Sequence, residues 1–327
     1  MVCLLIALSG VLPGAPLLVA ANRDERYDRP ADVITVLRPH APRILGGRDA
    51  VAGGTWLAVN EYGLVAGLTN QPLAGPRDDT RRSRGELPLA FAAHPDAATA
   101  VAKVCAELDP SDYNPCWLLV GDRHSLFSVG MTGGHRPVVR RLPPGSYVLE
   151  NVPLNDYSAK ARQVTDMVKA GITGKSGENG VNGANGADEA GEAIGTGRGS
   201  RVGTPAGLSL PSDAGPPGGM NLPGGTDEAE QALAAVLRDH RPAAGPQGYP
   251  AGPGQPAGPV QPAGPVRPAE LSAACVHTAS YGTRSAMIVK VGGTGLPQVF
   301  VTDGPPCQAP FQDVTVLWAA PAPGPTR

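Results

Sequence analysis

The chain has 327 residues, which allows one large domain or two small ones, and its formal net charge is −2. This balance excludes the strongly basic footprint of a nucleic-acid-binding protein, and the short basic run 77–84 is interpreted as a solvated loop. Gly and Pro, 44 and 36 residues, are frequent enough to predict a low-complexity segment.

The first twenty residues predict two buried strands. Residues 2–21 carry no charge, but Gly and Pro at positions 10, 13, 14 and 16 would break a membrane-spanning helix. A signal peptide would need a positively charged start, which is missing. We therefore expect strands at 2–9 and 17–21 around a turn at 10–15, and no membrane span.

The next 150 residues predict an alternation of hairpins and helices. Residues 44–54 are Gly-rich and are expected to form a loop. Helical patterning covers 85–108, with a break near 94–95, and a further helix is expected at 156–169. Strands are predicted at 55–60, 64–69, 116–120, 125–130, 138–142 and 146–149.

The composition then changes. Residues 171–268 are rich in Gly and Pro and predict a disordered surface insertion with one short helix near 227–240. Strands are expected again at 284–291, 298–302 and 314–318, so 269–318 would complete the domain begun by 1–170, followed by a disordered tail at 319–327. Strands, helices and further strands in this order predict a layered α+β fold with antiparallel sheets.

The cysteines give no disulfide or metal framework in the sequence. Their number is odd, no two form a C-x-x-C pair, and no histidine lies at zinc-ligand spacing. We therefore expect reduced thiols in the cytoplasm, no metal and no bound cofactor. The five are Cys3, Cys105, Cys116, Cys275 and Cys307.

Cys3 is the candidate nucleophile. A thiol on the first residue of a mature chain can use its own α-amine, with a pKa near 8, as the general base. A buried cysteine that only packs in a strand is the alternative. The polar run 22–25 would lie beside Cys3, where Arg23 and Asp24 could hold the amine and lower the thiol pKa.

Two asparagines are candidate oxyanion donors. Asn70 and Asn151 each follow a predicted strand, where a rigid amide could stabilise an oxyanion or simply cap a turn. Arg284 opens a late strand and could meet an anionic group.

Several motifs together resemble the NRDE family of transport and Golgi organisation 2-like proteins. They are an early cysteine, Ala-Ala-Asn-Arg-Asp-Glu at 20–25, Gly-Gly-Thr-Trp-Leu at 53–57, the hairpin strand 63–70, Arg-Gly-Glu-Leu at 84–87 and Tyr-Gly-Thr-Arg at 281–284. Asn-Glu-Tyr-Gly-Leu at 60–64 and Leu-Glu-Asn at 149–151 are similar to pieces of the choloylglycine hydrolases and penicillin acylases.

The resemblance implies a four-layer αββα sandwich and an N-terminal nucleophile hydrolase that acts on C–N amide bonds. Cys3 would attack, Asn70 and Asn151 would stabilise the oxyanion, and Arg23 and Asp24 would position the nucleophile. Four residues are expected to bind a small-molecule substrate: Asn22, Glu25, Trp56 and Arg284.

The resemblance also leaves alternatives open. In the family the cysteine follows the initiator Met directly, whereas Val2 precedes Cys3 here, so removal of Met1 would expose Val2 instead. One hypothesis is that translation starts at the Val2 codon, read as Met. A non-catalytic carrier of haem or a lipid is the second hypothesis, and a scaffold whose Pro-rich insertion recruits partners is the third. The substrate and the oligomeric state do not follow from the sequence.

Overall fold

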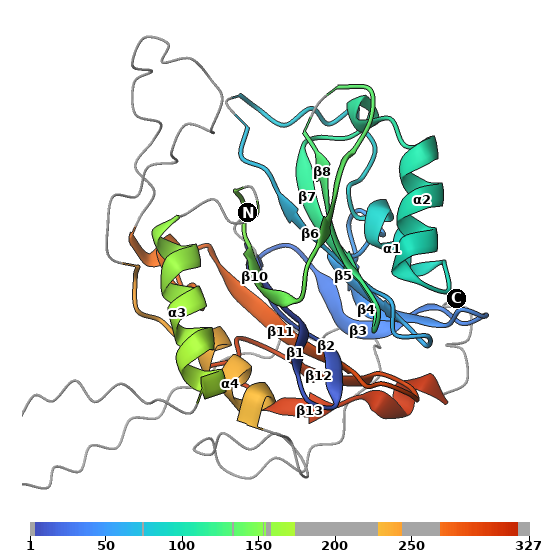
Figure 1. The fold of residues 1–327 in the computed structure, drawn as a ribbon. Helices are drawn as coiled ribbons and strands as arrows, with labels where there is room; N and C mark the ends of the chain where they lie inside the picture. Colours follow the sequence, from blue (N-terminus) through green and yellow to red (C-terminus); the bar gives the residue numbers. More distant parts are fainter. Residues whose placement is uncertain are drawn as a thin grey trace, which may run out of the picture.

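Two antiparallel sheets face each other at the centre of the molecule (Figure 1). The computed structural model describes residues 4–73, 75–132, 134–152, 154, 158–173, 228–243 and 269–319. The first sheet has the order β10-β1-β2-β11-β12-β13. Its strands are β1 (Leu4–Leu12), β2 (Ala15–Arg26), β10 (Gly145–Leu149), β11 (Tyr281–Val291), β12 (Gln298–Thr302) and β13 (Phe311–Asp313).

The second sheet follows the chain order from β3 to β9 without a crossover. Its strands are β3 (Ala31–Arg38), β4 (Ile44–Asp49), β5 (Leu57–Asn60), β6 (Val65–Asn70), β7 (Cys116–Gly121), β8 (Leu126–Met131) and β9 (Val138–Leu142). Neighbouring strands form antiparallel pairs, as expected for consecutive hairpins.

Helices cover the outer face of each sheet, which makes four layers (Figure 1). The helices α1 (Glu86–Ala92) and α2 (Ala97–Glu107) pack on the second sheet, and α3 (Ala159–Thr173) and α4 (Glu228–Leu237) pack on the first. The expected αββα sandwich is therefore confirmed. No helix in the described ranges is long and apolar enough to cross a membrane.

Burial on both faces explains the continuous apolar runs of β1 and β2. Leu5 and Ala7 of β1 belong to the core between the two sheets, whereas Leu4, Ile6 and Leu8 pack against the α3–α4 layer. Successive side chains of a strand point to opposite faces, so a strand covered on both faces needs apolar residues at every position.

The structure corrects two of the expected elements. Residues 44–54 were expected to form a loop, but β4 occupies Ile44–Asp49, where Gly46 packs closely on the Leu57 carbonyl and Gly47 on the Trp56 ring. Residues 314–318 were expected to be a strand, but Thr315–Trp318 is a 3-10 helix, η3. The Asp313 carboxylate accepts a hydrogen bond from the Thr315 amide at 2.8 Å, at the start of this turn.

Part of the predicted insertion 171–268 packs in the core. Helix α4 lies within the range predicted for a short helix, but its Leu233 and Leu237 are fully buried in the core of the first sheet. Residues 174–227 and 244–268, most of the predicted insertion, lie outside the described residues.

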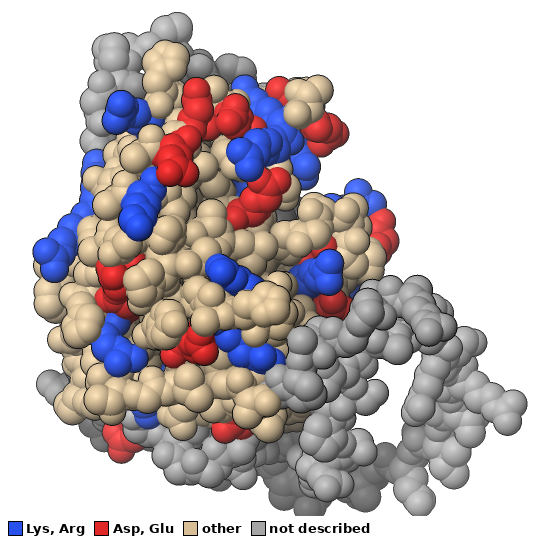
Figure 2. All heavy atoms as spheres, turned by 90° about the vertical axis from the view of Figure 1, so that its right-hand side faces the viewer, with Lys and Arg blue, Asp and Glu red and all other residues tan. Residues whose placement is uncertain are grey.

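On the face shown in Figure 2, basic and acidic side chains are interspersed.

Candidate functional site

The polar run Asn22 to Glu25 lies inside β2 rather than after it. All four residues are at most 7% exposed, although they are polar or charged. Their neighbours explain this placement, since Leu4 of β1 pairs with Asn22 on one side and β11 pairs with the whole run on the other. Buried polar groups need partners to offset their desolvation, so the contacts of each residue define its role.

Strand alternation divides the run between the two faces of the sheet. Arg23 and Glu25 point to the side of the second sheet and line a pocket there, whereas Asn22 and Asp24 point to the α3–α4 layer. The four residues were expected to form one group around a nucleophile. The structure instead gives the pocket only Arg23 and Glu25 from this run.

Arg23 lies over the ring of Trp56, with its guanidinium carbon 4.5 Å from the ring centroid. Such a cation–π contact contributes on the order of 1 kcal/mol when it is partly desolvated. The Trp56 ring is supported from β4, because a Cβ at Gly47 would come within 2.0 Å of its Cζ2 atom. A glycine at position 47 is therefore required for Trp56 to reach Arg23.

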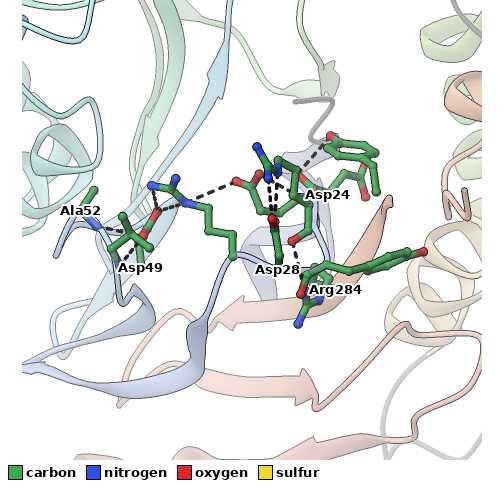
Figure 3. A network of polar contacts seen from close by, with 11 residues as sticks. Asp24, Asp28, Asp49, Ala52 and Arg284 are labelled. Atoms are coloured by element: carbon green, nitrogen blue, oxygen red, sulfur yellow. Dashed lines mark hydrogen bonds and ion pairs between the residues drawn. The ribbon is translucent and has the colours of Figure 1, made fainter. Parts of the chain in front are cut away.

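Glu25 takes part in a chain of ion pairs at the rim of the pocket. Arg29 lies 3.8 Å from the Glu25 carboxylate and 2.8 Å from that of Asp49. Burial alone would raise the pKa of Asp49, but hydrogen bonds from the Ala52 and Val51 amides and from Arg29 lower it below its ordinary value. Figure 3 shows these contacts, with Asp49 and Ala52 at one end of the network.

Asn70 at the end of β6 contributes to the same pocket from the second sheet. Asn151 follows β10 of the first sheet, and its side-chain amide donates a hydrogen bond to the Asn70 carbonyl. Beside it, the Thr69 hydroxyl donates to the Glu150 carbonyl at 2.6 Å. These bonds join the two sheets at this edge, so Asn151 holds the backbone of Asn70 in place.

The basic run 77–84 was interpreted as a solvated loop, but three of its arginines line the pocket. They are Arg77, Arg82 and Arg84. Arg82 bonds the Glu86 carboxylate at 2.7 Å and lies over the Tyr113 ring, and Arg84 donates to the Pro115 carbonyl at 3.3 Å. These contacts hold the run against the folded domain, and the density of arginines was the only signal of the pocket in this part of the sequence.

The pocket is polar and rich in guanidinium groups. Five arginines line it, against the two carboxylates of Glu25 and Asp49, and Trp56 and Leu68 add apolar surface. The space that the pocket offers to a water-sized molecule is about 70 Å³. Each guanidinium has five N–H donors in a planar arrangement that suits carboxylate or phosphate groups, so the pocket can bind an anion.

Asp24 lies on the opposite face of β2 and does not line the pocket. Its carboxylate accepts a hydrogen bond from the Thr283 hydroxyl at 2.6 Å and lies 4.0 Å from Lys160 Nζ of α3. Complete burial raises the pKa of Asp24 to about 6, against the opposing effect of the Lys160 charge. Asp24 therefore ties β2 to β11 and α3.

Asn22 and Arg284, which were expected to bind substrate, do not line the pocket, and their side chains donate to backbone carbonyls. The Asn22 amide donates to the carbonyls of Leu237 and Ala274, at 2.9 and 2.8 Å, and so anchors the end of α4. Arg284 is the extra residue of a bulge in β11 and bonds the carbonyls of Arg26 and Tyr27 on the surface, as Figure 3 shows. A strand bulge re-aims a side chain in a way that the sequence does not reveal.

Of the nine predicted site residues, the structure places four in the pocket. These are Arg23, Glu25, Trp56 and Asn70. Asn151 lies beside the pocket and contacts Asn70. Three others, Asn22, Asp24 and Arg284, lie elsewhere, and Cys3 lies outside the described residues.

Comparison with known proteins places the chain among its relatives. It is 35% identical over 147 residues to the Transport and Golgi organization protein 2 homolog of Bos taurus and 33% identical to the homolog of Mus musculus. Each alignment covers 42% of this chain and 51% of the relative, so the chain spans about half the length of the curated relatives it matches.

Solved structures with a similar arrangement are distant in sequence. A variant of conjugated bile acid hydrolase from Clostridium perfringens is 17% identical, with a TM-score of 0.37 over 50% of this chain and 57% of that one. Penicillin V acylase from Agrobacterium tumefaciens is 12% identical, with a TM-score of 0.30 over 52% and 58%.

The family comparison covers more than half of the chain. The model of the family described as Transport and Golgi organisation 2 matches residues 2–185, which include the polar run of β2, Trp56 and both asparagines. The resemblance carried by these motifs is confirmed, and the chain belongs to the Transport and Golgi organisation 2 family.

Proposed function

We propose that the pocket is the active site of an N-terminal nucleophile-type hydrolase that cleaves C–N amide bonds in a substrate with an anionic group. One observation carries the proposal. Arg23 from the first sheet and Asn70 from the second line a single pocket, and the start of β1, where Leu4 pairs with Asn22, lies next to Arg23 in the sheet. Cys3 directly precedes Leu4 in the sequence.

The proposed chemistry needs only the first residue of a chain that begins at Cys3 and one donor. The α-amine accepts the thiol proton, the thiolate adds to the amide carbonyl, and the Asn70 amide donates a hydrogen bond to the oxyanion. The protonated amine gives its proton to the leaving nitrogen as the C–N bond breaks, which leaves a thioester. The same amine then removes a proton from water, and the hydroxide releases a carboxylic acid and restores the thiol.

The other residues have supporting roles in this proposal. Arg23, stacked on Trp56, and the arginines at 77–84 bind the anionic group of the substrate. Asn151 is a positioning residue that fixes Asn70 through its carbonyl. Asp24 keeps β2 in register with β11 through Thr283 and has no contact with the substrate.

Intact-mass measurement of the native protein and labelling with a Cys-directed acylating probe test the proposal. We expect a mature chain that begins at Cys3 and a label that peptide mapping places on Cys3. Burial raises the pKa of Cys105 to about 11 and that of Cys116 to about 12, so these thiols remain protonated and slow at neutral pH. Cys3→Ala should remove the label, and the matched variant Cys105→Ala should keep it.

Two further variants separate the roles in the pocket. Asn70→Ala should slow acylation on the order of a hundredfold, the usual cost of losing one oxyanion donor. Arg140→Ala changes an exposed arginine of β9 and should leave the rate unchanged. A mature chain that retains Val2, or equal labelling of the wild type and Cys3→Ala, would refute the hydrolase.

A non-catalytic carrier is the second candidate, since the arginines can bind an anion without a nucleophile. The names of the curated relatives, which refer to transport, are compatible with such a role. The described lining residues include no His, Cys, Met or Tyr, the side chains that usually bind haem iron. A small anionic amphiphile is therefore the first carrier ligand to test, and a haem titration followed by absorbance tests the haem alternative.

A further inference from the structure

Two histidines and two cysteines meet on the other side of the first sheet, away from the pocket. Their potential ligand atoms all lie within 4.8 Å of one another. None of the four falls within residues 2–185, so the family match assigns no role to them. The residues are His240, Cys275, His277 and Cys307.

We propose that these four side chains bind a divalent transition metal, most suitably Zn²⁺, in a closed tetrahedral Cys₂His₂ site. The site is independent of the hydrolase proposal, because it shares no residue with the pocket.

The distances between the ligand atoms carry the proposal. With Zn–S bonds of about 2.3 Å and Zn–N bonds of about 2.0–2.1 Å, a tetrahedron has edges of about 3.8 Å between two sulfurs and about 3.5 Å between sulfur and nitrogen. In the structure the two cysteine Sγ atoms lie 3.8 Å apart, and His277 Nε2 lies 3.5 Å from one and 3.3 Å from the other. Three of the four ligand atoms are thus spaced as a bound zinc would require.

The fourth ligand is His240, whose ring centroid lies 5.0 Å from that of His277. Its Nδ1 lies 3.2 Å from the Cys275 carbonyl oxygen. Zinc-binding histidines usually donate one ring N–H to such an oxygen, which fixes the tautomer and leaves the other nitrogen for the metal. A proton on Nδ1 here leaves Nε2 of His240 as the ligand.

A disulfide is the competing explanation for the paired cysteines. A disulfide requires an S–S distance of about 2.05 Å, far below the 3.8 Å between Cys275 and Cys307. A disulfide would also not involve the two imidazoles beside the sulfurs, whereas a metal would be coordinated by all four side chains. Thiolate and imidazole ligands together are the set that zinc prefers, and four protein ligands describe a structural rather than a catalytic site.

The position of the cluster shows what the metal would stabilise. His240 follows α4, Cys275 and His277 precede β11, and Cys307 lies between β12 and β13. Hydrogen bonds already join the same segments, from the Cys275 amide to the Asp239 carbonyl at 2.8 Å and from the Arg238 side-chain Nε to the Pro306 carbonyl at 2.8 Å. A metal would cross-link these three segments and hold α4 on the sheet.

Metal analysis of the full chain tests the site. The protein is purified under reducing conditions with its affinity tag removed, and its zinc content is measured by plasma mass spectrometry. We expect about one zinc per chain, as a closed four-ligand site requires. Replacement by Co²⁺ should give the visible bands of tetrahedral cobalt and a thiolate-to-cobalt charge-transfer band.

Variants link the metal to the cluster. His240→Ala removes an exposed side chain, so it should fold and lose most of the bound metal, and Cys307→Ser should lose the charge-transfer intensity. Two matched variants outside the cluster, His40→Ala and Cys105→Ser, should retain about one zinc per chain.

Because a cysteine variant could fail to fold, the wild type supplies a second readout. Removal of zinc with a chelator should lower the melting temperature, and added Zn²⁺ should restore it. A wild type without metal that does not bind added Zn²⁺, a Cys275–Cys307 disulfide in the native protein, or a zinc content unchanged in His240→Ala and Cys307→Ser would overturn the proposal.

Discussion

Asp24 and Lys160 form an ion pair that is almost wholly removed from solvent. They are 0% and 4% exposed, and one Asp24 carboxylate oxygen and the Lys160 amine make no hydrogen bond within the described part of the chain. Removal of one member of such a pair leaves an isolated buried charge, which typically costs 3–5 kcal/mol. Replacement of both members is much less costly, because no charge is then left without a partner.

We therefore expect Asp24→Asn and Lys160→Met each to lower the free energy of unfolding by about 3 kcal/mol, and the double variant to recover most of that loss. Urea unfolding of the four proteins at pH 7 measures the coupling. Additive losses in the double variant would show that the two charges do not interact across their 4.0 Å separation.

The raised pKa of Asp24 also makes stability depend on pH. Burial raises its pKa from 3.8 to about 6 in the folded chain, so between these values the folded state binds more protons than the unfolded state. Stability contributed by this group is thus present below about pH 4 and is lost as pH rises through about 6, a change of about 3 kcal/mol.

The difference in stability between the wild type and Asp24→Asn/Lys160→Met should follow this step. The double variant lacks both titrating groups, so other carboxylates cancel in the comparison. We expect the wild type to lose stability relative to the double variant from pH 4 to pH 7. A constant difference over that range would mean that the Asp24 pKa is not raised.

At the scale of single elements, the absence of a side chain at Gly47 of β4 makes room for the Trp56 ring in the pocket. A Cβ at Gly47 would lie 2.0 and 2.1 Å from two ring atoms of Trp56, and the ring cannot keep its place over Arg23 if these atoms move. Gly47→Ala should therefore displace Trp56 and lower stability by about 1–3 kcal/mol, the usual cost of overpacking. It should also slow the acylation of Cys3, which gives the prediction a functional readout.

Gly293→Ala is the matched control, because a Cβ there meets nothing within 4 Å. Urea unfolding and probe labelling should distinguish the two variants, with Gly293→Ala close to the wild type in both. Equal behaviour of the two variants would mean that Trp56 does not depend on the space at Gly47.

Much of the element order follows from periodicity and turn residues, but the face of each polar residue does not. The strands around Gly10 and Gly63 are predicted by apolar runs and turn signals. The sequence does not predict β4 because its two central glycines are a loop signal in isolation. Their close contacts, Gly46 with the Leu57 carbonyl and Gly47 with the Trp56 ring, are visible only in the structure. Arg23 and Asp24 point to opposite faces of the sheet because they are successive residues of one strand. This alternation can be predicted only if the polar run is assigned to the strand.

The other parts of the site depend on contacts between distant segments. Arg284 was expected to meet an anion, but a bulge in β11 directs it to the surface. The sequence does not reveal the cluster of two cysteines and two histidines. Zinc motifs are recognised by short spacings between ligands, whereas these four side chains come from three segments between residues 240 and 307. Local sequence patterns carry no information on contacts between residues that are distant in the chain.

At the scale of the whole molecule, α4 is the element that the sequence placed in an insertion and the structure places in the core. Its Leu233 and Leu237 are fully buried against the first sheet, and the Leu237 carbonyl accepts a hydrogen bond from Asn22. Deletion of 171–268 would remove both leucines, this acceptor and the proposed metal ligand His240. Each buried leucine that is lost costs about 2–5 kcal/mol, which is comparable to a large share of the stability of a domain.

A shorter deletion tests whether α4 alone accounts for that loss. Residues 180–220 are rich in Gly, Ala and Pro and have few large apolar side chains to bury, so their removal should leave the melting temperature close to that of the full chain. Deletion of 171–268 should instead abolish cooperative unfolding, because the first sheet loses half of its helical cover. Circular dichroism during heating compares the three proteins. A cooperative transition after the longer deletion would show that α3 and the two sheets fold without α4, and its position in the core would then not be needed for stability.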